Sequence, residues 1–293
     1  MHISFHEQIS RNKRNSFILL SVIFLTFVLL GYVIGKIYSG SFFIIMSGFT
    51  AFSIIYILIG YYNSDKIALA SVNAVPASQE EFPRYHNLVE ALCIASGMPK
   101  PKLYVMKSEQ INAFATGRDP KNAVICVTTG AFEKLNKVEL EGVLAHELSH
   151  IANFDVRFMT LTAVLVGMIA IISQMFLRSL WLRGDGRDNK GKSMLMLAGI
   201  LLAVLAPLFV QLVQLAISRK REFVADASAV KFTRYTNGLI SALKKISQEH
   251  MPEKRINKAV APLFISDPLK RKISGLFQTH PPIEERIKFL ERM

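Results

Sequence analysis

The chain has 293 residues, 51% of them hydrophobic, and a formal net charge of +13. The hydrophobic residues are concentrated in long uncharged runs, which excludes an ordinary soluble globule. The basic clusters Arg11-Lys13-Arg14 and Arg219-Lys220-Arg221 flank those runs. This placement favours the cytoplasmic ends of membrane helices, with attraction to anionic lipid, and argues against a nucleic-acid-binding protein.

The N-terminal part predicts a helical hairpin across a bilayer. Residues 1–15 form a basic segment, and no signal-peptide cleavage site follows the first apolar run. Residues 16–62 contain two uncharged runs, 16–35 and 42–62, each long enough for a hydrocarbon core of about 30 Å. The basic N-terminus places both ends of this hairpin on the cytoplasmic side, so the chain should re-emerge there near Asn63.

Residues 63–157 predict the first part of a soluble domain that contains a small β-sheet. Alternating apolar residues indicate strands, and 3.6-residue periodicity indicates helices. The strands are expected at 102–106, 111–116 and 123–128, and the helices at 79–97, 131–135 and 137–152. Asn136 and Glu139 match a capping box at the start of the last helix. Cys93 and Cys126 fit no metal-binding spacing, which favours buried thiols in a reducing compartment.

Residues 158–218 contain two further uncharged runs, 158–177 and 193–218, separated by a charged loop. Their length favours a second transmembrane hairpin, and a buried or partly inserted helical pair is the alternative. An even number of spans returns the chain to the cytoplasmic side. Residues 219–293, which are polar and mostly helical, are then expected to complete the soluble domain.

The helix expected at 137–152 carries the pattern His146-Glu147-Leu148-Ser149-His150, which reads H-E-x-x-H. Residues four apart lie on one face of a helix, so the two imidazoles stand at a separation that suits one zinc ion per chain. Glu147 is close enough to act as a general base toward a water molecule. Such a pattern arises by chance in about one in a hundred chains of this length. Whether it marks a zinc site therefore depends on further ligands elsewhere in the chain.

A catalytic zinc site needs a third protein ligand. The metzincin pattern requires glycine at 153 and histidine at 156, where this chain has Asn153 and Val156, and the inverted pattern H-x-x-E-H is absent. In the remaining gluzincin arrangement a later helix supplies a glutamate. Glu222 and Asp226 fit that arrangement at i and i+4, with Glu222 as the metal ligand and Asp226 as a hydrogen-bond acceptor for a ligand imidazole.

Together these motifs resemble the HtpX-type membrane zinc metalloproteases, in the same broad family as the CAAX prenyl-protein endopeptidase. The resemblance covers nearly the whole chain and rests on motifs in the family's order: two spans, Asn112-Ala113-Phe114-Ala115-Thr116-Gly117, the H-E-x-x-H pattern, two spans, Glu222-Phe223-Val224-Ala225-Asp226 and His280-Pro281-Pro282. The expected fold is mainly α with a small β-sheet, with four transmembrane helices and a cytoplasmic gluzincin-like metalloprotease domain.

The resemblance also implies a biological role. It implies a zinc endopeptidase of the bacterial cytoplasmic (inner) membrane, multi-pass, with its active site facing the cytoplasm. Its substrates would be damaged or misfolded membrane proteins and their cytoplasmic loops, in membrane quality control and the stress response.

Four further residues are candidates for the site. The scissile carbonyl oxygen needs a stabiliser besides zinc, and His280 is the candidate, with a histidine that merely neighbours a helix cap as the alternative. Asn112, Ala113 and Phe114 are expected to form an edge strand that pairs with an extended substrate, an interpretation that draws mostly on the resemblance. The alternative is an ordinary strand with Phe114 in the core.

Some alternatives stay open on sequence alone. A catalytically silent scaffold would keep the fold and lose the chemistry, but the ligands and the base are all present. A metal transporter would also use histidines and carboxylates, but these residues lie outside the apolar runs. Asp155 either orients a ligand, pairs with Arg157, or belongs to a polar helix end. No motif indicates the oligomeric state.

Overall fold

The computed structural model describes residues 5–37, 39–165, 167, 219–249, 260–266, 268 and 281–293. The part of the chain within these ranges is mainly helical with one small mixed sheet, as predicted. Most of the predicted second hairpin, 158–218, lies outside the described residues, and so does His280.

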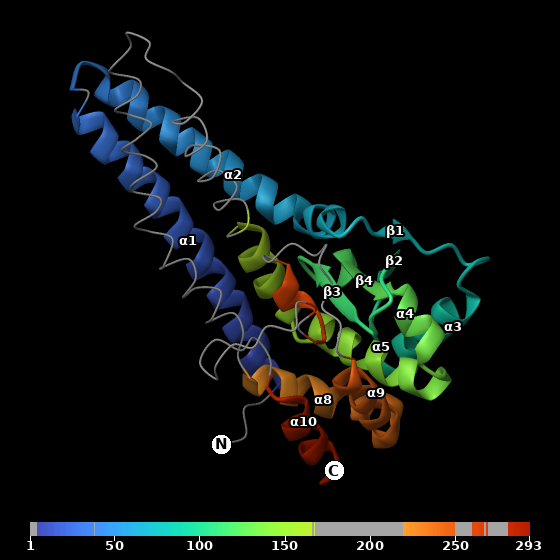
Figure 1. The fold of residues 1–293 in the computed structure, drawn as a ribbon. Coiled ribbons are helices and arrows are strands. Elements are labelled where there is room, and N and C mark those ends of the chain that lie inside the picture. Colours follow the sequence, from blue (N-terminus) through green and yellow to red (C-terminus); the bar gives the residue numbers. More distant parts are fainter. Residues whose placement is uncertain are drawn as a thin grey trace.

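Two long helices, α1 (Phe5–Ile37) and α2 (Phe42–Ser71), form an antiparallel hairpin that stands away from the sheet (Figure 1). A 3-10 turn at Ser39–Ser41 joins them where the sequence predicts an interruption. By length and composition both helices are candidate membrane spans. Only 33% and 11% of their most apolar stretches are buried within the protein, so most of this surface is available for lipid contact.

Both helices extend beyond the apolar runs that predict them. α1 begins inside the basic segment, and α2 continues past Asn63, where the chain is expected to leave the membrane, to Ser71. Asp65 and Lys66 end the apolar run without ending the helix, because neither residue disrupts the backbone hydrogen bonds. The last turns of α2 therefore reach the sheet, where Leu69 joins a core cluster with Phe114.

The sheet has four strands in the order β1-β2-β4-β3. β1 (Val75–Pro76) pairs antiparallel with β2 (Lys102–Met106), β4 (Ala123–Thr128) pairs parallel with β2, and β3 (Ala113–Gly117) pairs antiparallel with β4. The predicted strands at 102–106 and 123–128 are confirmed, and β3 begins two residues later than predicted. β1 is too short to show an alternation in the sequence.

Apolar clusters cover both faces of the central strand β4. Ile125 and Val127 belong to the larger cluster, whereas Val124 and Cys126 belong to the cluster beneath α2. The two cysteines are buried free thiols, as predicted. The larger cluster also takes residues from α3 (Pro83–Ser96), α5 (Lys137–Ala152) and α9 (Thr236–Gln248).

Helix α5 is the centre of the molecule, and its predicted bounds are confirmed. Asn136 Oδ1 accepts hydrogen bonds from the backbone N–H groups of Val138 and Glu139, and Glu139 Oε2 accepts one from the Asn136 N–H, which completes the predicted capping box. Gly142 lets α9 approach closely, because a Cβ atom there would lie 2.6 Å from the Leu239 nitrogen. This packing leaves thirteen of the sixteen residues of α5 buried.

Further helices in the described part of the chain contribute residues to the larger cluster. α4 (Thr129–Lys134) follows the central strand, while α8 (Arg219–Thr233) and α10 (Ile283–Leu290) pack beside α5 and α9 (Figure 1). α3 begins at Pro83 rather than at 79, because proline suits the first position of a helix. Gly97 ends it with φ +70°, a left-handed conformation that favours glycine.

Candidate metal centre

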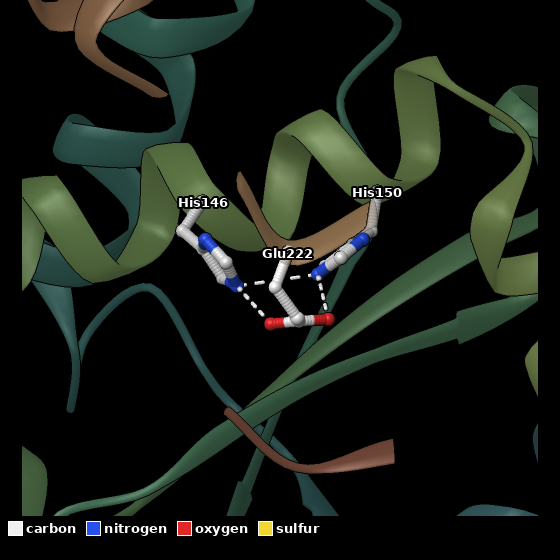
Figure 2. Close-up of side chains that lie close together, drawn as sticks. All are labelled: His146, His150 and Glu222. Carbon is white, nitrogen blue, oxygen red and sulfur yellow. Dashed lines mark hydrogen bonds and ion pairs between the residues drawn. The ribbon is translucent and has the colours of Figure 1, made fainter. Parts of the chain in front are cut away.

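Three predicted ligands meet between α5 and α8. His146 and His150 project from one face of α5, and Glu222 reaches them from α8 (Figure 2). The Nε2 atoms of the two histidines are 3.2 Å apart. Glu222 Oε2 lies 3.5 Å from His146 Nε2, and its Oε1 lies 3.6 Å from His150 Nε2. All three side chains are buried.

This donor set fits a zinc ion. With Zn–N and Zn–O distances of about 2.0–2.2 Å, tetrahedral geometry separates neighbouring ligand atoms by about 3.3–3.6 Å. The three observed distances of 3.2, 3.5 and 3.6 Å lie within about 0.1 Å of that range. Two imidazole nitrogens that face each other across a buried space can share only one proton, so a common cation explains the arrangement better than internal hydrogen bonding.

Asp226 and Arg286 form the first supporting group, which holds His146. Its Nδ1 lies 2.9 Å from Asp226 Oδ1, the contact predicted for Asp226, and this leaves Nε2 for the metal. Arg286 of α10 donates two hydrogen bonds to the same carboxylate, from Nε (2.9 Å) and Nη2 (2.6 Å). Arg286 is fully buried, and its Nη1 also lies 3.6 Å from Glu222 Oε2. α10 thereby closes this side of the site.

The electrostatics of this group favour a cation at His146. Burial raises the pKa of Asp226, but the charge and hydrogen bonds of Arg286 outweigh burial and hold that pKa below its usual value. Burial and the Arg286 charge lower the pKa of His146, whereas Asp226 and Glu222 raise it, with a net pKa of about 9. A positive charge is therefore stabilised at this imidazole, which is also what a divalent metal requires.

Asp155, Arg221 and Asn12 form the second supporting group, which holds His150. Its Nδ1 lies 3.1 Å from Asp155 Oδ2. Asp155 Oδ1 receives Arg221 Nε at 2.9 Å and the Asn12 side-chain amide at 2.6 Å. Of the alternatives left open by the sequence, the structure thus favours Asp155 as the residue that orients a ligand. Arg157 instead donates to the Tyr61 hydroxyl.

Glu147 lies beside the metal ligands, with both carboxylate oxygens buried. Within the described ranges neither oxygen has a hydrogen-bond partner. Burial raises the pKa of Glu147, opposed by the charges of His146 and His150 and by the backbone of Ala115 in β3. A buried carboxylate with so few protein donors around it is suited to accept a hydrogen bond from a water molecule or a substrate.

The predicted substrate strand lies at the edge of the sheet, but its outer side is covered. Asn112, Ala113 and Phe114 are all buried. The Ile265 N–H donates to the Ala113 carbonyl at 2.9 Å, and the Phe114 ring packs against Phe264 with 4.8 Å between centroids. The Asn112 amide donates to the Ser266 carbonyl at 3.1 Å. Phe114 thus lies in the core, as the alternative interpretation expects, and the substrate role of this strand stays a prediction.

Two residues of the supporting groups, Arg286 and Asn12, were missed by the sequence analysis. Arg286 occupies the apolar face of α10 formed by Ile283, Ile287 and Leu290, and a charge on such a face is a signal that could have been noticed. Asn12 continues the buried stripe of α1 that includes Leu19 and Ile23, but the basic residues around it conceal that signal. Both residues contact the site across large separations in sequence.

Comparisons with known proteins agree with this geometry. The sequence model of "Peptidase family M48" matches residues 79–293. The chain is 45% identical to a "Protease HtpX homolog" of Dictyoglomus thermophilum over 291 residues, which covers 99% of this chain and 95% of that protein. It is 49% identical to the "Protease HtpX homolog" of Caldanaerobacter subterraneus subsp. tengcongensis over 248 residues, which covers 83% and 82% of the two chains.

A solved structure shows the same fold. The chain is similar to the crystal structure of S. mikatae Ste24p with a TM-score of 0.51 and 18% identity. The match covers 97% of this chain and 66% of the other. The fold described above is therefore not peculiar to this chain.

Proposed function

Because this chain belongs to peptidase family M48 and is a zinc metalloendopeptidase, we propose that it cleaves misfolded or damaged proteins at the cytoplasmic face of a bacterial membrane. The observation that carries this proposal is the position of Glu147. This carboxylate is buried, directly follows His146 on α5 and is approached by the backbone of Ala115 in β3. A base beside three metal ligands is the minimum that peptide hydrolysis by water needs.

The residues divide the reaction between them. Zinc, when bound by His146, His150 and Glu222, lowers the pKa of water and polarises a carbonyl group. Glu147 accepts the proton of the attacking water and delivers it to the leaving amine. Burial raises the pKa of Glu147, which favours the protonated form that delivers the proton. Asp226 keeps His146 in the tautomer that leaves Nε2 free to bind.

Two further roles belong to this proposal. His280 stabilises the negative charge that develops on the scissile carbonyl oxygen. An extended substrate pairs with the outer edge of β3, near Asn112 and Ala113. That edge runs beside Glu147, since the Ala115 backbone lies close enough to affect its pKa. Pairing with substrate requires Phe264 and Ile265 to leave the positions they occupy.

We also propose the topology and the division of the chain. Residues 16–62 and 158–218 form two transmembrane hairpins, and residues 63–157 and 219–293 together form the protease domain on the cytoplasmic side. Basic residues near the start of α1 favour the cytoplasmic side. Asn12, which lies between two of them, contacts Asp155 behind His150, so this end of α1 and the metal centre lie on the same side. A reporter that is active only on the extracytoplasmic side of the membrane should give no signal when it is fused at Met293.

The activity is tested with the full chain purified in detergent and casein as substrate. Wild-type protein should hold one zinc per chain and degrade casein. Glu147→Gln should keep its zinc and lose cleavage by about 10²–10⁴-fold, because only proton transfer is removed. Glu141→Gln, on the same helix and partly exposed, is the matched control and should retain activity.

Two results would contradict the proposal. Unchanged cleavage in zinc-loaded Glu147→Gln would remove Glu147 as the base. Zinc-loaded wild-type protein that cleaves nothing would favour a silent scaffold instead. If the activity is present, proteomics of membrane fractions from cells with wild-type protein or Glu147→Gln would identify the substrates, and no enrichment of membrane or misfolded proteins in the variant would exclude the quality-control role.

A further inference from the structure

We infer that Asn12, on the candidate membrane helix α1, is a positioning residue for the zinc ligand His150. It acts through Asp155, and it makes the geometry of the metal site depend on where this end of α1 lies. The inference rests on the zinc centre and on the contacts of Asn12. It does not rest on the proposed substrates or on the role of Glu147.

The Asn12 side chain is enclosed and fully oriented. It is 2% exposed, although it lies between the exposed basic residues Arg11 and Lys13. Its amide nitrogen donates to Asp155 Oδ1 at 2.6 Å and to the backbone carbonyl of Asn153 at 3.0 Å. Its amide oxygen accepts a hydrogen bond from Arg221 Nη2 at 3.3 Å. Acceptors on one side and a donor on the other leave one orientation of the amide that satisfies every contact.

These contacts join the parts of the chain that carry two of the zinc ligands. Asp155 accepts from His150 on its other oxygen, at 3.1 Å. Arg221 directly precedes Glu222 on α8 and also binds Asp155, at 2.9 Å. Asn12, Asp155 and Arg221 therefore form a closed triangle behind His150. In Figure 1 the first turns of α1 lie against α8, where this triangle forms.

The turn that carries Asp155 depends on such external support. α5 ends at Ala152, and Phe154 has φ +57°, a left-handed conformation that residues other than glycine rarely adopt. The two hydrogen bonds of Asn12 reach both sides of Phe154, at Asn153 and at Asp155. Lys13 adds a contact to the turn itself, with its ammonium group 4.6 Å from the Phe154 ring centroid. Adjacent residues of α1 thus fix the turn.

Loss of the Asn12 amide should loosen His150 without removing its partner. Asp155 would keep Arg221 but lose a short hydrogen bond, and the Asn153 carbonyl would lose its side-chain donor. Residues that bind directly to metal-ligating histidines change metal affinity by about 10- to 100-fold when they are altered. Asn12 is one contact further away, so we expect a loss of zinc affinity of about three- to tenfold.

The test uses the full chain in detergent and compares two variants of α1. Asn12→Leu keeps the side-chain size and removes every polar contact. Ser16→Ala is the matched control, because Ser16 is equally buried one turn along and donates only to the Asn12 backbone carbonyl within the described residues. Zinc affinity is measured by competition with a chelator. The visible spectrum of the cobalt-substituted protein reports the ligand geometry.

Asn12→Leu is expected to weaken zinc binding and to change the cobalt spectrum, whereas Ser16→Ala changes neither. In an Asp155→Ala background Asn12→Leu should have no additional effect on zinc, because its route to His150 is gone. Asn12→Ser replaces Asn12→Leu if the larger change prevents folding. Asn12 variants that lower thermal stability and leave zinc affinity and the cobalt spectrum unchanged would overturn the inference. None of these measurements requires peptide cleavage, so failure of the proposed activity would not imitate that result.

Discussion

The two imidazoles of the metal centre are supported in the same way but from different parts of the molecule. Each presents Nδ1 to a buried carboxylate, and each carboxylate is bound by a buried arginine. His146 has Asp226 with Arg286, and His150 has Asp155 with Arg221. In both cases the carboxylate fixes the tautomer and the arginine compensates the buried charge.

The two carboxylate–arginine pairs differ in the elements that pack against them. Arg286 comes from α10 and Asp226 from α8, and neither side chain has any exposed surface. The pair behind His150 is completed by Asn12 of α1, one of the candidate membrane spans. One half of the metal centre is therefore held by the helices around α5, and the other half is also held by a candidate membrane span.

The largest expected effect on the free energy of unfolding comes from replacing the arginine behind each histidine. Arg286→Leu leaves Asp226 buried without its bidentate partner, which should cost about 3–5 kcal/mol of unfolding free energy. Arg221→Leu should cost less, about 1–3 kcal/mol, because Asp155 keeps Asn12 and His150 as donors. Denaturant unfolding in detergent measures both. Lys288→Leu on the exposed face of α10 is the control, and equal losses for the two arginines would contradict the comparison.

Next in size is the effect of each carboxylate on the metal. Asp226→Asn and Asp155→Asn should each weaken zinc binding by about 10- to 100-fold, because the charge that raises imidazole basicity is lost. If the two halves are independent, the losses should multiply in the double variant. Chelator competition gives the affinities, with Asp65→Asn on α2 as a control. A single variant with unchanged zinc affinity would show that its half does not support the metal.

A smaller effect is expected at the far end of α5. Glu139→Ala removes one side of the capping box and the 2.7 Å ion pair with Lys245, which should cost about 0.5–2 kcal/mol of stability. Zinc affinity should stay the same, because neither supporting group includes Glu139. Glu141→Ala provides the comparison on the same helix. A zinc loss as large as that of Asp155→Asn would mean that the stability of α5, rather than its supporting groups, controls metal binding.

The smallest effect distinguishes the two contacts that α1 makes with the turn after α5. Lys13→Met removes only the cation–π contact with Phe154, so stability should fall by at most about 1 kcal/mol. Zinc affinity should change less than it does in Asn12→Leu, since Lys13 contacts the Phe154 ring, whereas Asn12 contacts Asp155. Thermal unfolding and chelator competition check both expectations. A larger zinc loss for Lys13→Met would assign the positioning to the charge rather than to the amide.

Much of the site could be predicted from the sequence because its signals are local. The spacing of His146 and His150 is a property of one helix, and the capping box begins that helix where it was expected. Glu222 and Asp226 repeat the same spacing on a second helix, so each helix carries its residues in a readable pattern. The two apolar runs that form α1 and α2 were recognisable from their length without charge.

The partners of those residues were decided only by the tertiary structure. Asn12 and Asp155 are 143 positions apart, and Arg286 and His146 are 140 apart, so no periodicity connects them. The covering of β3 by Phe264 and Ile265 is equally non-local. A sequence determines which side chains a helix or strand presents on a face, because that depends on backbone geometry. Which buried donor meets which buried acceptor depends on how the elements pack, and here that packing joins a candidate membrane span to a zinc ligand through Asp155.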